Sequence, residues 1–235
     1  MNTQDALYKT IEANYHRVRD GIAAACAKAG RNVDEITLVA VTKFMPEETI
    51  IPALELGIRH VGENRAQEFR EKSELFKNYG CFTHFIGHLQ TNKVKYVIGN
   101  ADLVQSVDSV ELAKALQQGA NRRATVQDIL IEVNIGEEPQ KAGIPADGLA
   151  EMFDVVGQMP NLRLKGLMCI PPALQSWQTR PYFAKMRALF EKYRHVNGMR
   201  LGHLSMGMTG DYGVAIEEGA TIVRVGTGLF GVRHV

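Results

Sequence analysis

Residues 37–43 read TLVAVTK, a nearly continuous apolar run that ends in a lysine. Such a run is typical of a parallel strand that is buried on both faces of a sheet. Seven further β-rich runs follow along the chain, and helical patterns separate them. The eight predicted strands span residues 37–43, 58–61, 82–86, 103–107, 128–135, 163–169, 201–206 and 221–225.

Helical segments alternate with these strands. Residues 46–56 begin with a proline, which is common in the first turn of a helix, and precede Gly57, since glycine commonly follows the last turn. The segments 64–79 and 109–118 are each followed by a glycine in the same way. The remaining predicted helices span residues 3–29, 145–157, 182–196 and 211–218.

This alternation predicts the α/β class, with a single (β/α)8 TIM-type barrel and an extra N-terminal helix. The alternative is a doubly wound open sheet, which is disfavoured because no GxGxxG follows the first strand. The chain has 235 residues, a length that α/β barrels reach as one domain. No linker or change in composition divides it, so residues 1–235 are expected to form one domain.

Composition restricts the possible partners. Hydrophobic residues make up 45% of the chain, and the formal net charge is +1, so neither a nucleic-acid partner nor an anionic membrane is expected. No signal peptide and no apolar run long enough to span a membrane is present. The three cysteines are widely spaced, which argues against a disulfide framework and a zinc cluster and favours a reducing, cytoplasmic compartment.

Functional residues of a barrel lie at the carboxyl ends of its strands. Lys43 ends the first predicted strand. It is either a solvated lysine at a strand end or a nucleophilic amine whose pKa is depressed by burial, as attack on an aldehyde requires. Position alone favours the solvated lysine.

The segment 221–231, TIVRVGTGLFG, is more specific. Arg224 lies two residues before the turn formed by Gly226, Thr227 and Gly228. Loops after the last two strands of a barrel often bind phosphate, and glycines let backbone N–H groups approach its oxygens. The simpler interpretations are that the glycines form a tight turn and that Arg224 forms a salt bridge with a carboxylate. Ser205, at the end of the seventh strand, could donate to the same phosphate.

Other polar residues near strand ends are less specific. Asn64 follows the second strand and either caps the next helix or enters the site. His84 and Asn134 could reach the barrel mouth. The histidines lack metal-ligand spacing, so no metal site is expected.

An ordered set of motifs now identifies a resemblance. LVAVTK, VGEN, HFIGHLQTNK, IEVNIG, LKGLMCIP, LSMGMTGDY and VRVGTGLFG run in this order from about residue 37 to residue 231. Because it contains these motifs in this order, the chain resembles the pyridoxal phosphate homeostasis family, whose barrel is similar to that of bacterial alanine racemase. The motifs cover nearly the whole chain and are specific only in combination.

The resemblance implies pyridoxal 5′-phosphate (PLP) bound as a Schiff base on Lys43. It also implies that Arg224 faces the pyridine nitrogen, which then stays unprotonated and makes a poorer electron sink. The resemblance further implies that Ser205, Gly226 and Thr227 hold the phosphate and that Asn64 lies near the ring. It also implies that Met206 lines the site. The implied function is PLP homeostasis without established turnover, with PLP-dependent apoenzymes as transient acceptors.

Two alternatives remain open. One is a weak PLP-dependent amino-acid racemase, and the other is a Schiff-base aldolase barrel without PLP. The chain ends at Val235, so we expect no room for the second domain of alanine racemase, and a monomer is the expected state. Gly210 puts a phosphate role of Thr209 in doubt. Residues 171–181 are expected to be a solvated connection rather than a cover over the site.

Overall fold

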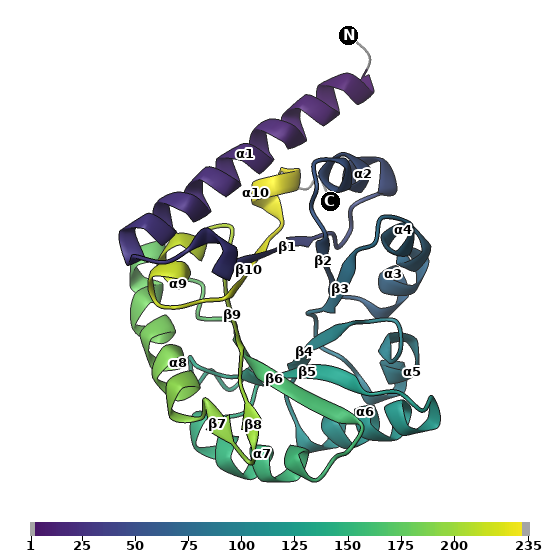
Figure 1. The fold of residues 1–235 in the computed structure, drawn as a ribbon, viewed down its shortest axis with the longest axis vertical. Coiled ribbons are helices and arrows are strands. Elements are labelled where there is room, and N and C mark those ends of the chain that lie inside the picture. Colours follow the sequence, from purple (N-terminus) through teal and green to yellow (C-terminus); the bar gives the residue numbers. More distant parts are fainter. Residues whose placement is uncertain (1–2, 232–235) are drawn as a thin grey trace.

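The computed structural model describes residues 3–231, in which eight parallel strands close into a barrel surrounded by helices (Figure 1). The order around the barrel is β1-β10-β9-β6-β5-β4-β3-β2, and every neighbouring pair is parallel. These strands are β1 (Thr37–Val41), β2 (His60–Glu63), β3 (Phe82–Phe85), β4 (Leu103–Val107), β5 (Gln127–Val133), β6 (Leu162–Cys169), β9 (His203–Met208) and β10 (Ile222–Val225). The predicted (β/α)8 barrel is confirmed, and the open sheet is excluded.

Helices connect successive strands and form the outer layer. They are α1 (Thr3–Ala29), α2 (Glu47–Glu55), α3 (Ala66–Glu71), α4 (Ser73–Asn78), α5 (Val94–Val97), α6 (Val110–Arg122), α7 (Leu149–Gly157), α8 (Arg180–Lys192), α9 (Tyr212–Glu217) and α10 (Thr227–Phe230). The predicted N-terminal helix is confirmed over residues 3–29. No helix within residues 3–231 is both long and apolar enough to cross a membrane.

Three predicted helices differ from the observed ones. The segment 64–79 forms two helices, α3 and α4, which meet at Lys72. Helix α6 continues through Gly119 to Arg122. The missing side chain of Gly119 leaves room for Val94 of α5 and for Ile98, which follows α5, because a Cβ there would lie 3.2 Å from side-chain atoms of both. Helix α8 ends at Lys192, and a short hairpin follows it.

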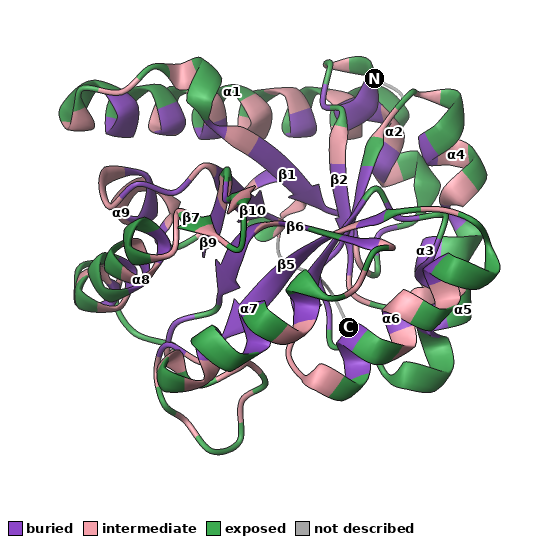
Figure 2. Ribbon diagram, turned by 60° about the horizontal axis from the view of Figure 1, so that its bottom comes forward, coloured by how far each residue is buried: buried purple, intermediate pink, exposed green. Residues whose placement is uncertain are grey.

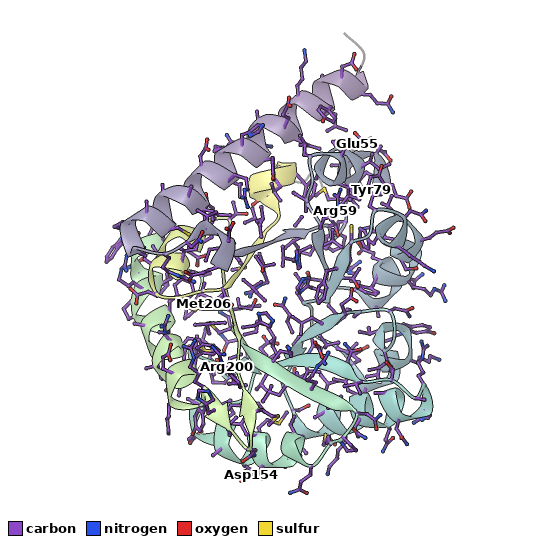
Figure 3. The ribbon with its side chains drawn as sticks, in the orientation of Figure 1. Glu55, Arg59, Tyr79, Asp154, Arg200 and Met206 are labelled. Atoms are coloured by element: carbon purple, nitrogen blue, oxygen red, sulfur yellow. The ribbon has the colours of Figure 1, made fainter. Side chains whose placement is uncertain are left out.

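That hairpin pairs β7 (His195–Val196) with β8 (Met199–Arg200) in the antiparallel sense. Asn197 and Gly198 form its turn with φ of 51° and 74°, the conformation that Asn-Gly favours in two-residue hairpins. Asn197 also donates to Asp154 of α7, 3.1 Å away, so the hairpin is fixed to the outer layer; Figure 3 labels Asp154 on α7 and Arg200 on β8.

The hydrophobic core has two layers. The larger lies between the barrel and its helices, and Figure 2 shows the buried strands at the centre with exposed faces on the surrounding helices. The smaller layer fills the inside of the barrel with Val39, Leu103, Leu130, Met168 and Ile222. A barrel interior filled by branched and long apolar side chains is a packed core rather than a pore.

Helix α1 covers the place where the barrel closes. It packs against α9 and α10, next to β1 and β10 (Figure 1). Its buried residues Ile11, Val18, Ile22 and Cys26 follow helical spacing and form one apolar stripe. The N-terminal helix is therefore part of the hydrophobic core.

Candidate functional site

A cavity of about 480 Å³ lies at the carboxyl ends of the strands. Its walls come from residues at the carboxyl ends of β1, β9 and β10 and from residues that follow β1, β2, β3, β6, β9 and β10. The lining residues are Val41, Lys43, Asn64, Ile86, Ile170, Met208, Thr209, Gly210, Arg224, Gly226 and Thr227. The volume is typical of a small-molecule site.

Lys43 lies in a tight turn just after β1. The turn runs from Thr42 to Met45, where the Met45 N–H donates to the Thr42 carbonyl at 3.0 Å. Phe44 follows Lys43 with φ of 60°, which is uncommon for a bulky residue and is the conformation that a type II turn requires at this position. This turn, rather than the strand itself, directs the half-buried Lys43 toward the cavity.

A buried ionic group holds both sides of this turn. Lys72 Nζ donates to the Thr42 carbonyl and to Glu63 Oε1, both at 2.8 Å, and it lies 3.3 Å from Glu68 Oε2. The Thr42 hydroxyl donates to the same Glu63 oxygen at 2.6 Å, and the Phe44 N–H donates to Glu68 Oε2 at 2.6 Å. The residues before and after Lys43 are therefore both bound to one charged cluster.

Glu63 is fully buried within this cluster. Burial raises the pKa of its carboxyl, and the hydrogen bond from Lys72 opposes that rise. Its second oxygen, Oε2, has no hydrogen-bond partner among the residues that the structure describes. The negative charge of Glu63 therefore depends on Lys72.

Arg224 projects from β10 into the inside of the barrel, where it is only 4% exposed. Its Nη1 donates to Ser205 Oγ at 2.6 Å, and its Nη2 donates to the Cys169 carbonyl at 2.9 Å. Burial lowers the pKa of the guanidinium, but arginine remains protonated in proteins. Arg224 is thus a fixed positive charge at the floor of the cavity.

Polar contacts continue from Arg224 through the barrel. Ser205 Oγ donates to Gln105 Oε1 at 2.6 Å, Gln105 Nε2 lies 2.7 Å from His84 Nδ1, and His84 Nε2 lies 3.0 Å from His60 Nδ1. Burial lowers the pKa of His84 well below its ordinary value, and the neighbouring His60, His203 and Arg224 add to this effect. His84 is therefore a neutral member of a chain that supports Arg224, and it does not line the cavity.

The turn after β10 forms the opposite wall of the cavity. Gly226 precedes the first turn of α10, which begins at Thr227, and the first N–H groups of a helix have no partner within it. Thr209, from the loop after β9, accepts a hydrogen bond from the Gly228 N–H at 3.1 Å and also lines the cavity. These backbone and hydroxyl donors suit an oxyanion such as phosphate.

Asn64 follows β2 and reaches the same cavity. It does not cap α3, because Arg65 occupies the N-cap position. Its Oδ1 is buried and has no hydrogen-bond partner among residues 3–231. Since buried polar atoms are normally paired, this oxygen is suited to a ligand.

Five of the seven expected site residues line this cavity: Lys43, Asn64, Arg224, Gly226 and Thr227. Ser205 and Met206 do not. Ser205 is fully buried and faces the inside of the barrel, where Arg224 and Gln105 use its hydroxyl. Met206, labelled on β9 in Figure 3, belongs to the core between barrel and helices. The alternation of side chains along a strand puts adjacent residues on opposite faces.

Two neighbouring residues, Met208 and Thr209, also line the cavity, although Gly210 puts a phosphate role of Thr209 in doubt on sequence grounds. Both reach the cavity because Gly207, with φ of 92°, turns the chain at the end of β9. Asn134 is instead used within its own loop, where it donates to the Glu138 carbonyl and accepts from the Glu138 N–H. Trp177, in the segment 171–181, is 73% exposed and does not line the cavity.

One further carboxyl group lies near Arg224. Glu132 on β5 is 7% exposed. Burial, with a smaller contribution from the negative charge of Asp108, raises the pKa of its carboxyl to about 7, although Arg224 and His88 partly oppose the rise. Within residues 3–231, no group of histidine, cysteine and acidic side chains is arranged to hold a metal ion.

The fold and this cavity together define a class of protein, a parallel (β/α)8 barrel whose mouth brings together a lysine, an arginine and a glycine-threonine turn. The chain belongs to the alanine racemase N-terminal domain family, whose model matches residues 9–234. Among its relatives, the pyridoxal phosphate homeostasis protein of Aquifex aeolicus is 46% identical over 218 residues, which are 92% of this chain and 96% of that protein. The protein of the same name from Escherichia coli is 36% identical over 231 residues, 95% of this chain and 97% of that protein.

Several solved structures are similar to this chain in fold. PipY of Synechococcus elongatus, determined with PLP bound, is 34% identical and superposes with a TM-score of 0.78, covering 89% of this chain and 100% of that one. A protein of unknown function from Bifidobacterium adolescentis superposes with a TM-score of 0.89 at 36% identity and covers 96% of each chain. An alanine racemase of Clostridium difficile, 13% identical with a TM-score of 0.70, shares the fold over 97% of this chain and 57% of its own.

Proposed function

We propose that residues 1–235 form one domain that binds PLP covalently through Lys43 and serves PLP homeostasis by holding and releasing the cofactor. The observation that carries this proposal is the cavity of about 480 Å³ in which Lys43, Arg224 and the Gly226–Thr227 turn meet. The relatives named as pyridoxal phosphate homeostasis proteins and the PLP-bound PipY structure support it.

The residues of the cavity fit this cofactor. Bound PLP supplies an aldehyde with which a lysine amine condenses. Lys43 is the lysine of the cavity, the Gly226–Thr227 turn and Thr209 provide donors for the phosphate, and Asn64 offers an unpartnered oxygen. Ser205 supports the site through Arg224, and Met206 supports it by packing behind β9.

Arg224 favours retention of the cofactor over turnover. If the ring nitrogen of bound PLP faced Arg224, this fixed cation would disfavour protonation of that nitrogen. An unprotonated ring is a weaker electron sink, so loss of a proton from an amino-acid α-carbon gains little stabilisation. We therefore propose a non-enzymatic role, with weak racemase activity as the alternative.

The rim of the cavity suits transfer of the cofactor to PLP-dependent apoenzymes. Phe44, Ile170 and Met208 are 48%, 37% and 38% exposed, and Leu174 and Trp177 lie farther along the chain from Ile170 with 45% and 73% exposure. Exposed apolar side chains around a site are typical of a surface that contacts another protein. We propose a monomer of the cytoplasm that contacts such acceptors transiently.

Borohydride reduction followed by peptide mass mapping tests the proposal. The pyridoxyl group is expected on Lys43, and the Lys43→Ala variant is expected to lose both this adduct and the visible absorbance of the bound cofactor. Lys185→Ala, at an exposed position on α8, is the matched control and retains both. An adduct on another lysine alone would contradict the proposal.

The racemase alternative has its own measurement. Exchange of the α-proton of alanine or serine in deuterated water is expected to be no faster with the protein than with free PLP. Rapid exchange that disappears in Lys43→Ala would establish an enzyme instead.

A further inference from the structure

A second cavity, of about 360 Å³, lies beside the first. Asn64 lines both cavities, but Lys43, Arg224 and the Gly226–Thr227 turn do not reach the second one. Its walls are α3 on one side and the segment 88–93 with Tyr96 on the other, and α3 and α5 lie next to each other in Figure 1. The segment 88–93 belongs to the motif HFIGHLQTNK, which the proposed function leaves without a role.

Cations dominate this second cavity. Arg65, Arg70 and Lys93 line it, and no carboxylate is among its lining residues within the part of the chain described here. Arg65 has an acidic neighbour, Glu68, at 3.9 Å. Arg70 and Lys93 form no ion pair with any residue between 3 and 231.

Arg70 and Lys93 both lie near the aromatic ring of Tyr96. The Arg70 guanidinium carbon lies 5.6 Å, and Lys93 Nζ 5.9 Å, from the centroid of Tyr96. Attraction to the face of a ring stabilises a cation without neutralising its charge. The floor beneath them is apolar, because Phe85 and Leu89 line the cavity and are 1% and 2% exposed.

We propose that this second cavity binds a small phosphorylated molecule with a ring-like apolar body, independently of Lys43. A phosphomonoester carries close to two negative charges, which matches the unpaired Arg70 and Lys93, and the guanidinium fork suits phosphate oxygens. The apolar floor accommodates the body of the ligand, and the volume is within the range of small-molecule sites.

Pyridoxine 5′-phosphate and inorganic phosphate are suitable probes, because neither has an aldehyde that could react with a lysine. Their binding is measured by titration calorimetry to the full-length protein and to Lys43→Ala, Arg70→Ala/Lys93→Ala and Lys95→Ala. Lys95 is the matched control, since it lies 5.0 Å from the same ring but does not line the cavity. Loss of the charge-assisted contacts in the double variant is expected to weaken the non-covalent binding of pyridoxine 5′-phosphate at least about tenfold.

The Lys43→Ala and Lys95→Ala proteins are expected to retain this binding event within about twofold. Pyridoxine, which lacks the phosphate, is expected not to bind there. Equal weakening in Lys95→Ala, or no difference between wild type and the double variant, would overturn the proposal.

A footprint on the unmodified chain gives a second measurement in case the double variant does not fold. Pyridoxine 5′-phosphate is expected to protect Lys93, but not Lys95, from acetylation, and equal reactivity of Lys93 with and without the probe overturns the proposal. Both results are separate from the pyridoxyl mapping on Lys43, so failure of either proposal leaves the other measurable.

Discussion

Lys72 Nζ lies 2.8 Å from the carbonyl oxygen of Thr42, the residue that precedes Lys43. The same amine neutralises the fully buried Glu63. The charged cluster therefore links the stability of the fold to the position of the lysine that we propose as the cofactor-binding residue.

Replacement of Lys72 by methionine is expected to destabilise the protein by about 3–5 kcal/mol, because the variant leaves the Glu63 carboxylate buried without a partner. Chemical unfolding measures this loss, and retention of PLP after gel filtration measures the effect on Lys43. Lys77→Met, at an exposed position on α4, is the control. The double variant Lys72→Met/Glu63→Gln removes both charges and is expected to recover part of the stability. Equal stability of Lys72→Met and the control Lys77→Met would refute the role of the cluster.

Ser205→Ala is expected to lower the free energy of unfolding by about 1–3 kcal/mol, because Arg224 and Gln105 both lose a buried hydrogen-bond partner. Cofactor affinity is expected to fall as well, since the guanidinium is then held only by the Cys169 carbonyl. Thr10→Ala, which removes an exposed hydroxyl on α1, serves as the control for unfolding and for PLP binding. Unchanged affinity in Ser205→Ala would show that Arg224 needs no support from Ser205.

Glu132 is expected to make stability depend on pH. Its pKa is raised to about 7 in the folded chain, so its stabilising contribution is complete below about pH 4.5 and is lost as the pH rises through 7. The full change amounts to about 3 kcal/mol. Glu132→Gln removes it, so the variant is expected to gain stability relative to wild type between pH 5 and pH 8 in urea unfolding without added PLP. A constant difference across this range, as expected for the exposed control Glu111→Gln, would contradict the prediction.

Gly87→Ala is expected to destabilise the fold and to weaken PLP binding. A Cβ at this position would lie 2.2 Å from the backbone oxygen of Asn64, which cannot move without displacing a cavity residue. Overpacking of this kind costs about 1–3 kcal/mol. In Gly202→Ala the added Cβ meets no atom within 4 Å, so thermal unfolding and PLP binding of this control are expected to match wild type. Equal behaviour of the two variants would show that the loop can shift freely.

The sequence was sufficient to locate the eight strands because several are nearly continuous apolar runs and all lie between helical patterns, although the second and seventh begin two residues later than predicted. Glycine was a less reliable sign of a helix end. Gly119 lies inside α6, where it allows close packing against α5, and this contact is visible only in the folded structure. The Asn197–Gly198 turn, by contrast, carried a hairpin signal in the sequence that the helical pattern around it obscured.

Part of the candidate site could be predicted from the residues at the ends of the strands. Residues after β1, β2 and β10 meet because parallel strands place their carboxyl ends together. Ser205 was expected from its place at a strand end and Met206 from the family resemblance, yet side-chain alternation and the conformation of Gly207 bring Met208 and Thr209 to the cavity instead. The contact of Lys72 with Thr42 joins residues 30 positions apart, so no local pattern reveals it.

The closure of the barrel by β10 against β1 has a consequence for biosynthesis. Strand β10 and the turn after it carry Arg224, Gly226 and Thr227, while Lys43 follows the first strand to emerge from the ribosome. A nascent chain therefore exposes Lys43, which we propose as the cofactor-binding residue, long before it acquires the Gly226–Thr227 turn and the Arg224 guanidinium. Capture of the cofactor in this cavity must be post-translational, or must coincide with completion of the final strand, and bound cofactor thereby distinguishes finished barrels from partial ones.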